Sequence, residues 1–286
     1  MKSFEKLENR YELTGTLVLT QATHVGCGEG DEDRQLDAIF VQDKKGVRYI
    51  PGSSFRGALR STVERLLASL DPQKSCLLLD GYHPQCPTSN ATNRERFSKM
   101  VEQGKSEQEL FNFLAEKLCL TCKVFGSPFM ASKVRVADLY RLNNCNPPAQ
   151  VRYGVGIDRD TETAASGLLF TYEVVEKGEK FHFKLWAENV TEEDLGVLGL
   201  GIMELLHGEF RVGAKMAAGL GQCQLREDSL ALRYFADTKE LQEYIKTGQF
   251  PQSLKDEKVK EFFRNKVEDL LGKDKKEADH AQALGE

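Results

Sequence analysis

The most informative segment of this 286-residue chain is Ile50-Pro51-Gly52-Ser53-Ser54-Phe55-Arg56-Gly57-Ala58-Leu59-Arg60-Ser61. Pro51-Gly52 ends the segment before it. A hydroxyl of Ser53 or Ser54 is expected to cap the helix that follows, because a helix start leaves backbone N–H groups without partners. Apolar residues then recur at the 3.6-residue period of one helix face as far as Leu70. The pattern predicts an amphipathic helix over 54–70.

Two arginines lie near the start of this helix. Arg56 and Arg60 are four residues apart, so both fall on one side of the opening turns. With the backbone N–H groups and serine hydroxyls they form a predicted anion site, for which phosphate is the expected ligand. The alternative is a capped helix with two solvated arginines. The net charge of −5 argues against a general nucleic-acid coat. Locally, however, an acidic stretch over 29–43 precedes a basic one over 44–70.

With several further motifs, this segment resembles the RAMP proteins of type III CRISPR effector complexes, above all the backbone subunits that hold guide RNA. The resemblance covers about 11–225, and the ordered set of motifs is specific although each alone is weak. In chain order the other motifs are His24-Val25-Gly26, Leu36-Asp37, Cys119-x-x-Cys122-Lys123-Val124-Phe125-Gly126-Ser127-Pro128, Gly156-Ile157-Asp158-Arg159-Asp160-Thr161, Tyr172-Glu173-Val174-Val175-x-x-Gly178-x-x-Phe181, and Gly213-Ala214-Lys215 through Gly219-Leu220-Gly221.

The order of predicted elements is strand, helix, strand, strands, helix, strand. Strands are expected at 11–20 and 133–142, a hairpin of 168–175 with 180–187, a helix over 191–207 with a near capping box at its start, and a last strand from 221. This is an α+β plan of the split βαβ, ferredoxin-like kind. The resemblance implies the same βαββαβ core, similar to an RNA-recognition motif.

Around this core the sequence predicts three additions. A polar, cysteine-bearing insertion occupies about 71–132, with a helix near 107–118, and by resemblance a protruding β-hairpin lies at about 157–168. We expect a RAMP domain over 1–228 and a helical C-terminal extension over 229–286, with helices at 238–246 and 258–271 and a disordered tail from Gly272. The extension either packs on its own domain or binds a partner.

Four cysteines of the insertion have metal-ligand spacing. Cys119 and Cys122 form one pair, and Cys76 and Cys86 lie upstream, so a tetrahedral structural zinc site is predicted. His83 is an alternative ligand to Cys86. Buried free thiols and a redox pair are the other interpretations. Cys27, Cys145 and Cys223 remain outside the site, and Cys223 is expected in the core.

By resemblance, Asp37 is the residue needed for cutting target RNA. RNA carries its own nucleophile, the 2′-OH. A carboxylate can accept its proton or hold Mg²⁺ or Mn²⁺, which lowers the pKa of the hydroxyl. Asp31 and Asp33 are rival candidates, and a solvated loop aspartate is the alternative without catalysis.

Other contacts to RNA are also expected by resemblance. His24 faces the guide backbone, and Arg152 and Arg159 grip phosphates near the base of the hairpin, which wedges into the guide–target duplex. The glycine loop of 213–221 runs under the guide, with Lys215 as a phosphate contact. Without the resemblance, a packed histidine, a surface hairpin and a flexible turn are the competing interpretations.

Three functions remain open from sequence. The first is a backbone subunit that binds crRNA and cuts paired target RNA with Asp37, and the second is an inactive scaffold of the same complex. The third is a stand-alone CRISPR RNA processing nuclease, which would need a histidine base. Expected partners are crRNA, target RNA, other RAMP backbone subunits and further effector subunits. No signal peptide and no apolar run of about 20 residues is found, so a cytoplasmic protein without a membrane span is expected.

Overall fold

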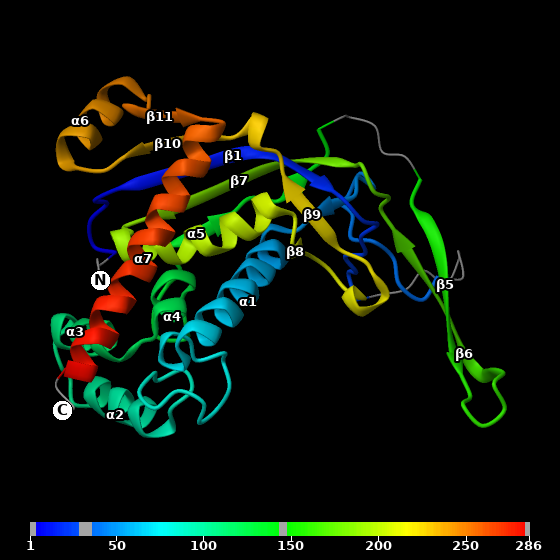
Figure 1. The fold of residues 1–286 in the computed structure, drawn as a ribbon, viewed down its shortest axis with the longest axis horizontal. Helices are drawn as coiled ribbons and strands as arrows, with labels where there is room; N and C mark the ends of the chain where they lie inside the picture. The colour runs from blue at the N-terminus through cyan, green and yellow to red at the C-terminus, as the bar shows by residue number, and fades with distance from the viewer. Residues whose placement is uncertain (1–3, 29–35, 143–147, 284–286) are drawn as a thin grey trace.

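The computed structural model describes residues 4–28, 36–142 and 148–283. Its strands and helices are shown in Figure 1. In chain order they are β1 (Arg10–Leu19), β2 (Tyr49–Ile50), α1 (Gly52–Leu70), α2 (Ala91–Glu102), α3 (Glu107–Lys117), α4 (Leu120–Phe125), β3 (Val134–Val136), β4 (Leu139–Tyr140), β5 (Gln150–Ile157), β6 (Ala164–Val174), β7 (Lys180–Glu188), α5 (Glu192–His207), β8 (Phe210–Arg211), β9 (Gln222–Leu225), β10 (Ala231–Phe235), α6 (Thr238–Thr247), β11 (Gln252–Lys255) and α7 (Glu257–Ala283).

The central sheet is built around β1. On one side β7 runs antiparallel along nearly all of β1, and β3 pairs with the far edge of β7. On the other side two short strands share β1, because β10 pairs with its first half and β9 with its second half. The order β9-β1-β7-β3, antiparallel throughout, makes this a mixed α+β fold. β8 and β11 extend the edge.

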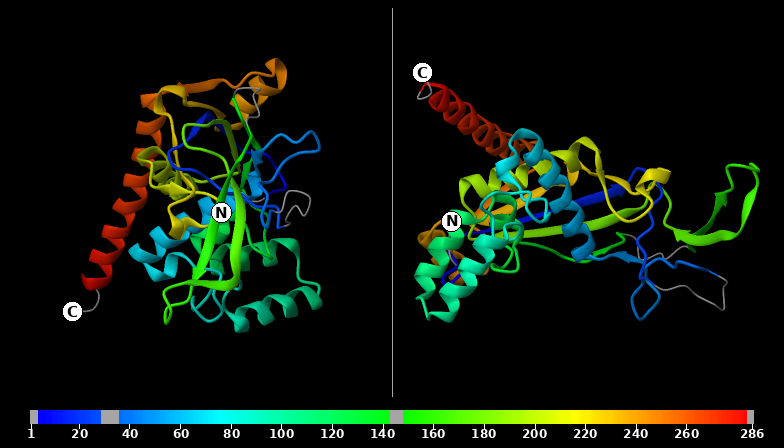
Figure 2. Two further views of the ribbon diagram at one scale, coloured as in Figure 1. Left: turned by 90° about the vertical axis from the view of Figure 1, so that its right-hand side faces the viewer. Right: turned by 90° about the horizontal axis from the view of Figure 1, so that it is seen from below.

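One face of this sheet is apolar. Leu13, Leu17 and Leu19 alternate along β1, and Phe181, Phe183 and Leu185 do so along β7, so both strands turn buried side chains to the same side. Helices α1 and α5 cover that side (Figures 1 and 2). The ring of Phe55 on α1 lies 5.5 Å from that of Phe183, centroid to centroid. The strand predicted at 11–20 and the helix predicted at 54–70 are therefore confirmed.

Glycines let helix α5 approach its two neighbours closely. A methyl group added at Gly201 would lie 2.6 Å from Leu59 of α1, and one at Gly199 would lie 2.9 Å from Val267 of α7. Helix α5 starts with the capping box that its sequence predicts, because the Thr191 hydroxyl accepts from Asp194 N and the Asp194 carboxylate accepts from Thr191 N. The predicted helix over 191–207 is therefore confirmed.

The C-terminal segment belongs to the same core. Val259, Phe263 and Leu270 of α7 are buried and join the main cluster, so the apolar face predicted for 258–271 packs on its own chain. The sequence did not predict β10 and β11, which this segment adds to the sheet. These strands are only five and four residues long, too short for a clear alternation. The tail expected to be disordered is helical as far as Ala283.

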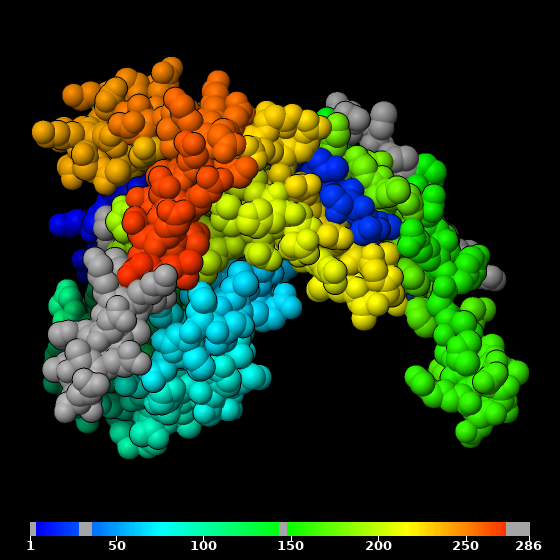
Figure 3. All heavy atoms as spheres, viewed as in Figure 1, coloured from blue at the N-terminus to red at the C-terminus, as the bar shows by residue number. Residues whose placement is uncertain are grey.

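The hairpin departs most from expectation. Strand β6 pairs with β5, from Gln150↔Val174 to Ile157↔Ala164, and not with β7. The predicted hairpin of 168–175 with 180–187 is therefore wrong, since β7 is taken up by β1 and β3. Residues 157–161, expected at the base of a protruding hairpin, lie at its tip, where Asp158 accepts hydrogen bonds from the N–H groups of Asp160 and Thr161. Figures 2 and 3 show the hairpin standing out from the body.

A helix that crosses a bilayer must be both long and apolar. Among residues 4–28, 36–142 and 148–283, no helix combines the length and apolar composition needed to cross a bilayer.

Candidate functional sites at the cysteine cluster and the hairpin root

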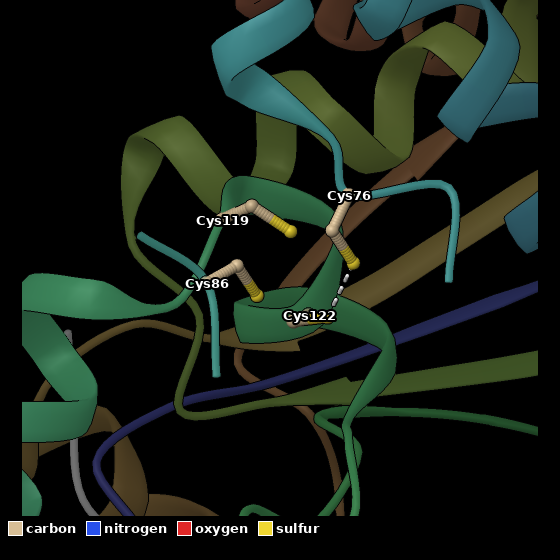
Figure 4. A group of neighbouring side chains, drawn as sticks. All are labelled: Cys76, Cys86, Cys119 and Cys122. Atoms are coloured by element: carbon tan, nitrogen blue, oxygen red, sulfur yellow. Dashed lines mark hydrogen bonds between the residues drawn. The ribbon is translucent and has the colours of Figure 1, made fainter. Parts of the chain in front are cut away.

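The four predicted cysteine ligands come together in one buried cluster. Figure 4 shows the side chains of Cys76, Cys86, Cys119 and Cys122 pointing toward one another. Their Sγ atoms all lie within 4.8 Å of each other, and those of Cys76 and Cys122 are 3.5 Å apart. A tetrahedral zinc ion with Zn–S bonds of about 2.3 Å places its sulfurs about 3.8 Å apart. The donor set and its spacing therefore fit a metal ion.

Two local structures aim these sulfurs inward. Cys119 is the N-cap residue of α4 and Cys122 lies in the first turn of that helix, so one helix start supplies both thiols. On the other side, Leu77 and Leu78 adopt the left-handed backbone conformation, with φ of 49° and 56°, and turn the chain sharply after Cys76. Such conformations are costly for residues with side chains, so the surroundings must hold this turn in place.

His83 does not replace Cys86 in the cluster. Its Nδ1 accepts a hydrogen bond of 2.9 Å from the backbone N–H of Cys86, which leaves Nε2 to donate to the carbonyl of Gln73 at 2.6 Å. The histidine orients the Cys86 segment. A hydrogen bond from Cys119 lowers the pKa of the Cys86 thiol, and one from Cys122 lowers that of Cys119 to about 6. Hydrogen bonds from Cys119 raise the pKa of the Cys76 and Cys122 thiols in turn, so the four thiols of the cluster share their protons unevenly.

The start of α1 differs from its prediction. Neither Ser53 nor Ser54 caps the helix; both are exposed, the N-cap residue is Pro51, and the N–H of Gly52 donates to Asp138 Oδ1 at 2.8 Å. The serines cannot cap because the helix begins one to two residues earlier than expected, and an aspartate distant in sequence takes their place.

Arg56 and Arg60 both bind the chain itself. Arg56 Nη1 donates to the carbonyl of Phe125 at 2.7 Å and to Ser132 Oγ at 2.9 Å. Arg60 donates to the carbonyl of Gly126 at 2.8 Å and to Glu64 at 2.7 Å. These guanidinium groups clamp the end of α4 against α1, a role that the helical spacing of the arginines could not reveal.

Asp37 is exposed at the root of the hairpin. Its Oδ2 accepts hydrogen bonds from the N–H of Thr171 at 2.6 Å and from the Thr171 hydroxyl at 3.0 Å. The next residue, Ala38, forms a parallel bridge with Tyr172, so the loop of Asp37 lies along the free edge of β6. The hydrogen bonds from Thr171 hold the pKa of Asp37 below its usual value, and the side chain is a carboxylate at neutral pH.

A cavity of about 620 Å³ opens beside this carboxylate. One wall is the hairpin, with Tyr153 72% exposed, and the floor holds the buried ion pair of Arg48 and Glu173, whose charged atoms lie 3.2 Å apart. The lining residues are Leu36, Asp37, Arg48, Pro148, Ala149, Val151, Tyr153, Leu169, Thr171 and Glu173. Among the lining residues that the structure describes, apolar side chains form the walls and the aromatic ring of Tyr153 and the carboxylate of Asp37 are exposed. Such a lining suits a planar ligand whose negative charge reaches Asp37 through a bound cation.

The two faces of the hairpin carry different groups. Residues paired across β5 and β6 point to the same side, so Tyr153 and Thr171 share the face of Asp37. The opposite face carries Phe170 and Tyr172, whose rings lie 4.1 and 4.4 Å below the Lys215 ammonium. The hairpin therefore separates Asp37 from the glycine loop.

His24 is a packed histidine at this root, with only 3% of its surface exposed. Its Nδ1 lies 2.6 Å from the carbonyl oxygen of Glu173, and its own carbonyl accepts from Ala214 N at 2.9 Å. Gly213 is required at this contact, since a Cβ there would lie 2.2 Å from the His24 carbonyl oxygen. His24 thus ties the glycine loop to the hairpin.

The remaining predicted residues are more scattered. Arg152 pairs with Glu176 at 3.3 Å on the face opposite Asp37, and Arg159 is exposed at the hairpin tip rather than its base. Asp31 and Asp33, the rivals of Asp37, and Cys145 lie outside the described residues. Cys223 is fully buried in the main core, as expected.

Sequence reasoning missed several residues of these surfaces. Arg65 and Arg211 are exposed and line a second cavity of about 320 Å³ between α1 and the glycine loop. The signal for Arg65 was its place on the polar side of a predicted helix. Tyr153 and Thr171 lacked any such signal, because the pairing of β5 with β6 was not foreseen.

Comparison with known families places the chain. The model of the RAMP superfamily matches residues 16–224, which includes both candidate sites, the whole of β3 and β7, and parts of β1 and β9. No curated protein matches the sequence. Because the match extends over well more than half of the chain, the protein belongs to the RAMP superfamily.

Proposed function

We propose that this chain is a backbone subunit of a type III CRISPR effector complex, which binds crRNA and cuts the paired target RNA with Asp37. The observation that carries the proposal is the placement of Asp37, an ionised and exposed carboxylate at the mouth of a 620 Å³ cavity at the hairpin root. Membership of the RAMP superfamily supports the same function.

The lowered pKa of Asp37 favours metal binding over general-base catalysis as its proposed role. A carboxylate whose pKa lies below the usual range is a weak general base at neutral pH. It is a good ligand for Mg²⁺ or Mn²⁺, which would lower the pKa of a target 2′-OH. In the proposed reaction the 2′-OH gives its proton to water and its oxygen forms a bond to phosphorus, while the 5′ oxygen leaves and takes a proton from water, giving a 2′,3′-cyclic phosphate and a 5′-OH. Thr171 holds the carboxylate in place through two hydrogen bonds.

The proposed guide contacts lie on the other side of the hairpin. Lys215 is part of the glycine loop, and Arg65 and Arg211 line the cavity between that loop and α1. Arg56 and Arg60 face α4 instead, so we assign them the structural role of holding this helix. Ser53 and Ser54 lie exposed at the start of α1. Arg152, Arg159 and His24 complete the set, the last by positioning Ala214.

The proposal treats β1, β3, β7 and β9 as a ferredoxin-like core. The order β9-β1-β7-β3 supports this, because it puts the last strand next to the first and the third between the first and the second, as expected for a split βαβ unit. The cysteine cluster is proposed as a structural zinc site, because four buried sulfurs close one end of an insertion with a small apolar cluster of its own.

An inactive scaffold is the second candidate, and one observation favours it. Among the described lining residues of the cavity, the other carboxylate is Glu173, which pairs with Arg48 and accepts from Phe40 N. A divalent cation at Asp37 would therefore take its remaining ligands from phosphate and water. Such a site is weak until RNA is bound.

The experiment compares cleavage by the assembled complex containing wild type, Asp37→Ala, Asp37→Asn or Asp43→Asn. Asp43 is the matched control, an acid of the same region that accepts hydrogen bonds within its own turn. Both Asp37 variants should bind guide and target as wild type does while cutting at least about 100-fold more slowly. A target with 2′-deoxyribose at the scissile position should resist cutting by wild type.

Cleavage at the wild-type rate by Asp37→Ala would leave the scaffold as the function. Loss of guide binding in the same variant would show instead that Asp37 has a structural role. Asp43→Asn should cut normally, and its failure would point to a general effect of charge in this region.

A further inference from the structure

Two arginines reach from α1 to the end of α4, but they differ at one atom. Arg60 Nη2 donates to the Sγ of Cys122 at 3.5 Å, whereas Arg56 donates to two oxygens, the carbonyl of Phe125 and the hydroxyl of Ser132. The other nitrogens of Arg60 are also engaged, Nη1 by Gly126 and Nε by Glu64. The carboxylate of Glu64 therefore fixes the plane of the guanidinium, and the Nη2 fork points at the sulfur.

A metal ion held by the four cysteines would make a positive charge favourable where this fork points. Four thiolates around a divalent cation leave a formal double negative charge, and here all four sulfurs belong to buried residues. A buried charge is costly unless it is paired or hydrogen-bonded. Two hydroxyls provide part of the hydrogen bonding to the sulfurs, since Thr121 Oγ1 lies 3.3 Å from Cys119 Sγ and Thr88 Oγ1 lies 3.5 Å from Cys122 Sγ. Arg60 adds a positive charge that a hydroxyl cannot supply.

We propose that Arg60 is a positioning residue of the metal site, which donates an N–H···S hydrogen bond to Cys122, offsets part of the negative charge of the metal–thiolate centre, and so retains a zinc-like divalent cation. The inference rests on the metal binding proposed above for the four cysteines. The second arginine of the Arg56-x-x-x-Arg60 pair then has a structural role, because it connects the metal centre to the core helix α1.

Two consequences distinguish this role from simple packing. Loss of the N–H···S bond should weaken metal binding, because groups that contact ligand atoms typically change metal affinity by about 10- to 100-fold. It should also leave more electron density on one sulfur, that of Cys122, and so make this thiolate react faster with an alkylating reagent. A helix clamp that only holds α4 in place predicts neither the selectivity for Cys122 nor the dependence on charge.

The experiment uses the purified full-length chain with its metal, in wild type, Arg60→Met, Arg60→Lys and Arg56→Met forms. Arg56→Met is the matched control, because it removes a guanidinium that clamps the same end of α4 without contacting sulfur. Zinc content is measured first by elemental analysis. Zinc loss to a chromogenic chelator is then followed, together with iodoacetamide labelling of each cysteine by peptide mass spectrometry.

Arg60→Met is expected to lose zinc about 10-fold faster or more and to label at Cys122 before the other three cysteines. Arg56→Met should stay within about 2-fold of wild type, and Arg60→Lys should fall between the two because it keeps the charge but not the fork. If Arg60→Met fails to fold, Arg60→Lys and Glu64→Gln carry the same comparison, the second by releasing the guanidinium from its orienting carboxylate.

Equal zinc loss and equal Cys122 labelling in Arg60→Met and Arg56→Met would overturn the proposal. A wild-type protein without zinc would overturn it together with the metal site. A wild type that holds zinc while Arg60→Met behaves like wild type would overturn the proposal alone and leave the metal site standing.

Discussion

The cysteine-bearing insertion and the hairpin root differ in which side chains they bury and which they expose. In the insertion the thiols are buried, and the arginines next to them each bind named atoms of the same chain. At the hairpin Tyr153, Ile157 and Leu169 are more than half exposed, and Asp37 faces solvent. Buried polar groups with partners indicate a structural site, whereas exposed apolar side chains beside an exposed carboxylate indicate a surface that binds something.

This difference in burial predicts that mutations in the two regions have different effects. A change in the insertion should act through stability, and activity should fall only as the folded fraction falls. A change at the hairpin should leave stability alone and act on binding or cutting. The largest effect of a single substitution is therefore expected in the insertion.

Cys122→Ser should have the largest effect of all. The metal-binding energy of structural zinc sites reaches about 10–16 kcal/mol in zinc-finger peptides, and here it would hold together a small cluster around Phe113, Leu114 and Met130. We expect loss of zinc, faster proteolysis within 71–132, and a lower unfolding temperature. Cys27→Ser, at an exposed position, is the control and should keep both zinc and stability. A Cys122→Ser protein with normal zinc content and normal proteolysis would contradict the structural assignment.

Much of the insertion site was predictable because cysteine is informative wherever it occurs. The spacing of Cys119 and Cys122 selected the site, and the structure chose Cys86 over His83 through the hydrogen bond that the histidine accepts. The role of Arg60 was not predictable, since its partners are the carbonyl of Gly126 and a sulfur more than sixty positions away. Helical periodicity places an arginine on a face without saying what lies opposite.

The hairpin was less predictable for a related reason. An alternating pattern identifies a strand but not its partner, and 168–175 alternates equally well whether it pairs with β5 or with β7. The glycines of β5 also made this strand hard to recognise, because they carry no side chain that could show an alternating pattern. Phe170 covers Gly154, so the aromatic residue that fills the strand surface comes from the opposite strand. Asp37 was found by resemblance, but its cavity depends on the pairing and could not be anticipated.

Tyr153→Ala tests the hairpin side of the comparison. Stacking of a base on an aromatic side chain contributes about 1–3 kcal/mol, so target affinity of the guide-loaded protein should fall by between about 5- and 150-fold. The unfolding temperature should stay unchanged, because the ring is 72% exposed. Tyr140→Ala is the matched control, an exposed tyrosine that stacks on Tyr49 away from the cavity. A stability loss in Tyr153→Ala without a change in target affinity would show that the hairpin, like the insertion, has a structural role.

The smallest effects are expected along α1 and beside the glycine loop, and they decide which arginines touch RNA. Each phosphate contact that is lost should reduce the slope of log affinity against log salt by about one unit. Arg65→Gln and Arg211→Gln should each do so, because both side chains are exposed in the cavity beside the glycine loop. Arg56→Gln should leave the slope unchanged and lower stability, since its guanidinium holds the carbonyl of Phe125 and the hydroxyl of Ser132. The measurement is guide-RNA affinity across a salt series, with thermal unfolding of each variant alongside. A reduced slope in Arg56→Gln with unchanged stability would mean that this arginine leaves α4 when RNA arrives, and that burial in the free chain does not separate structural from binding residues.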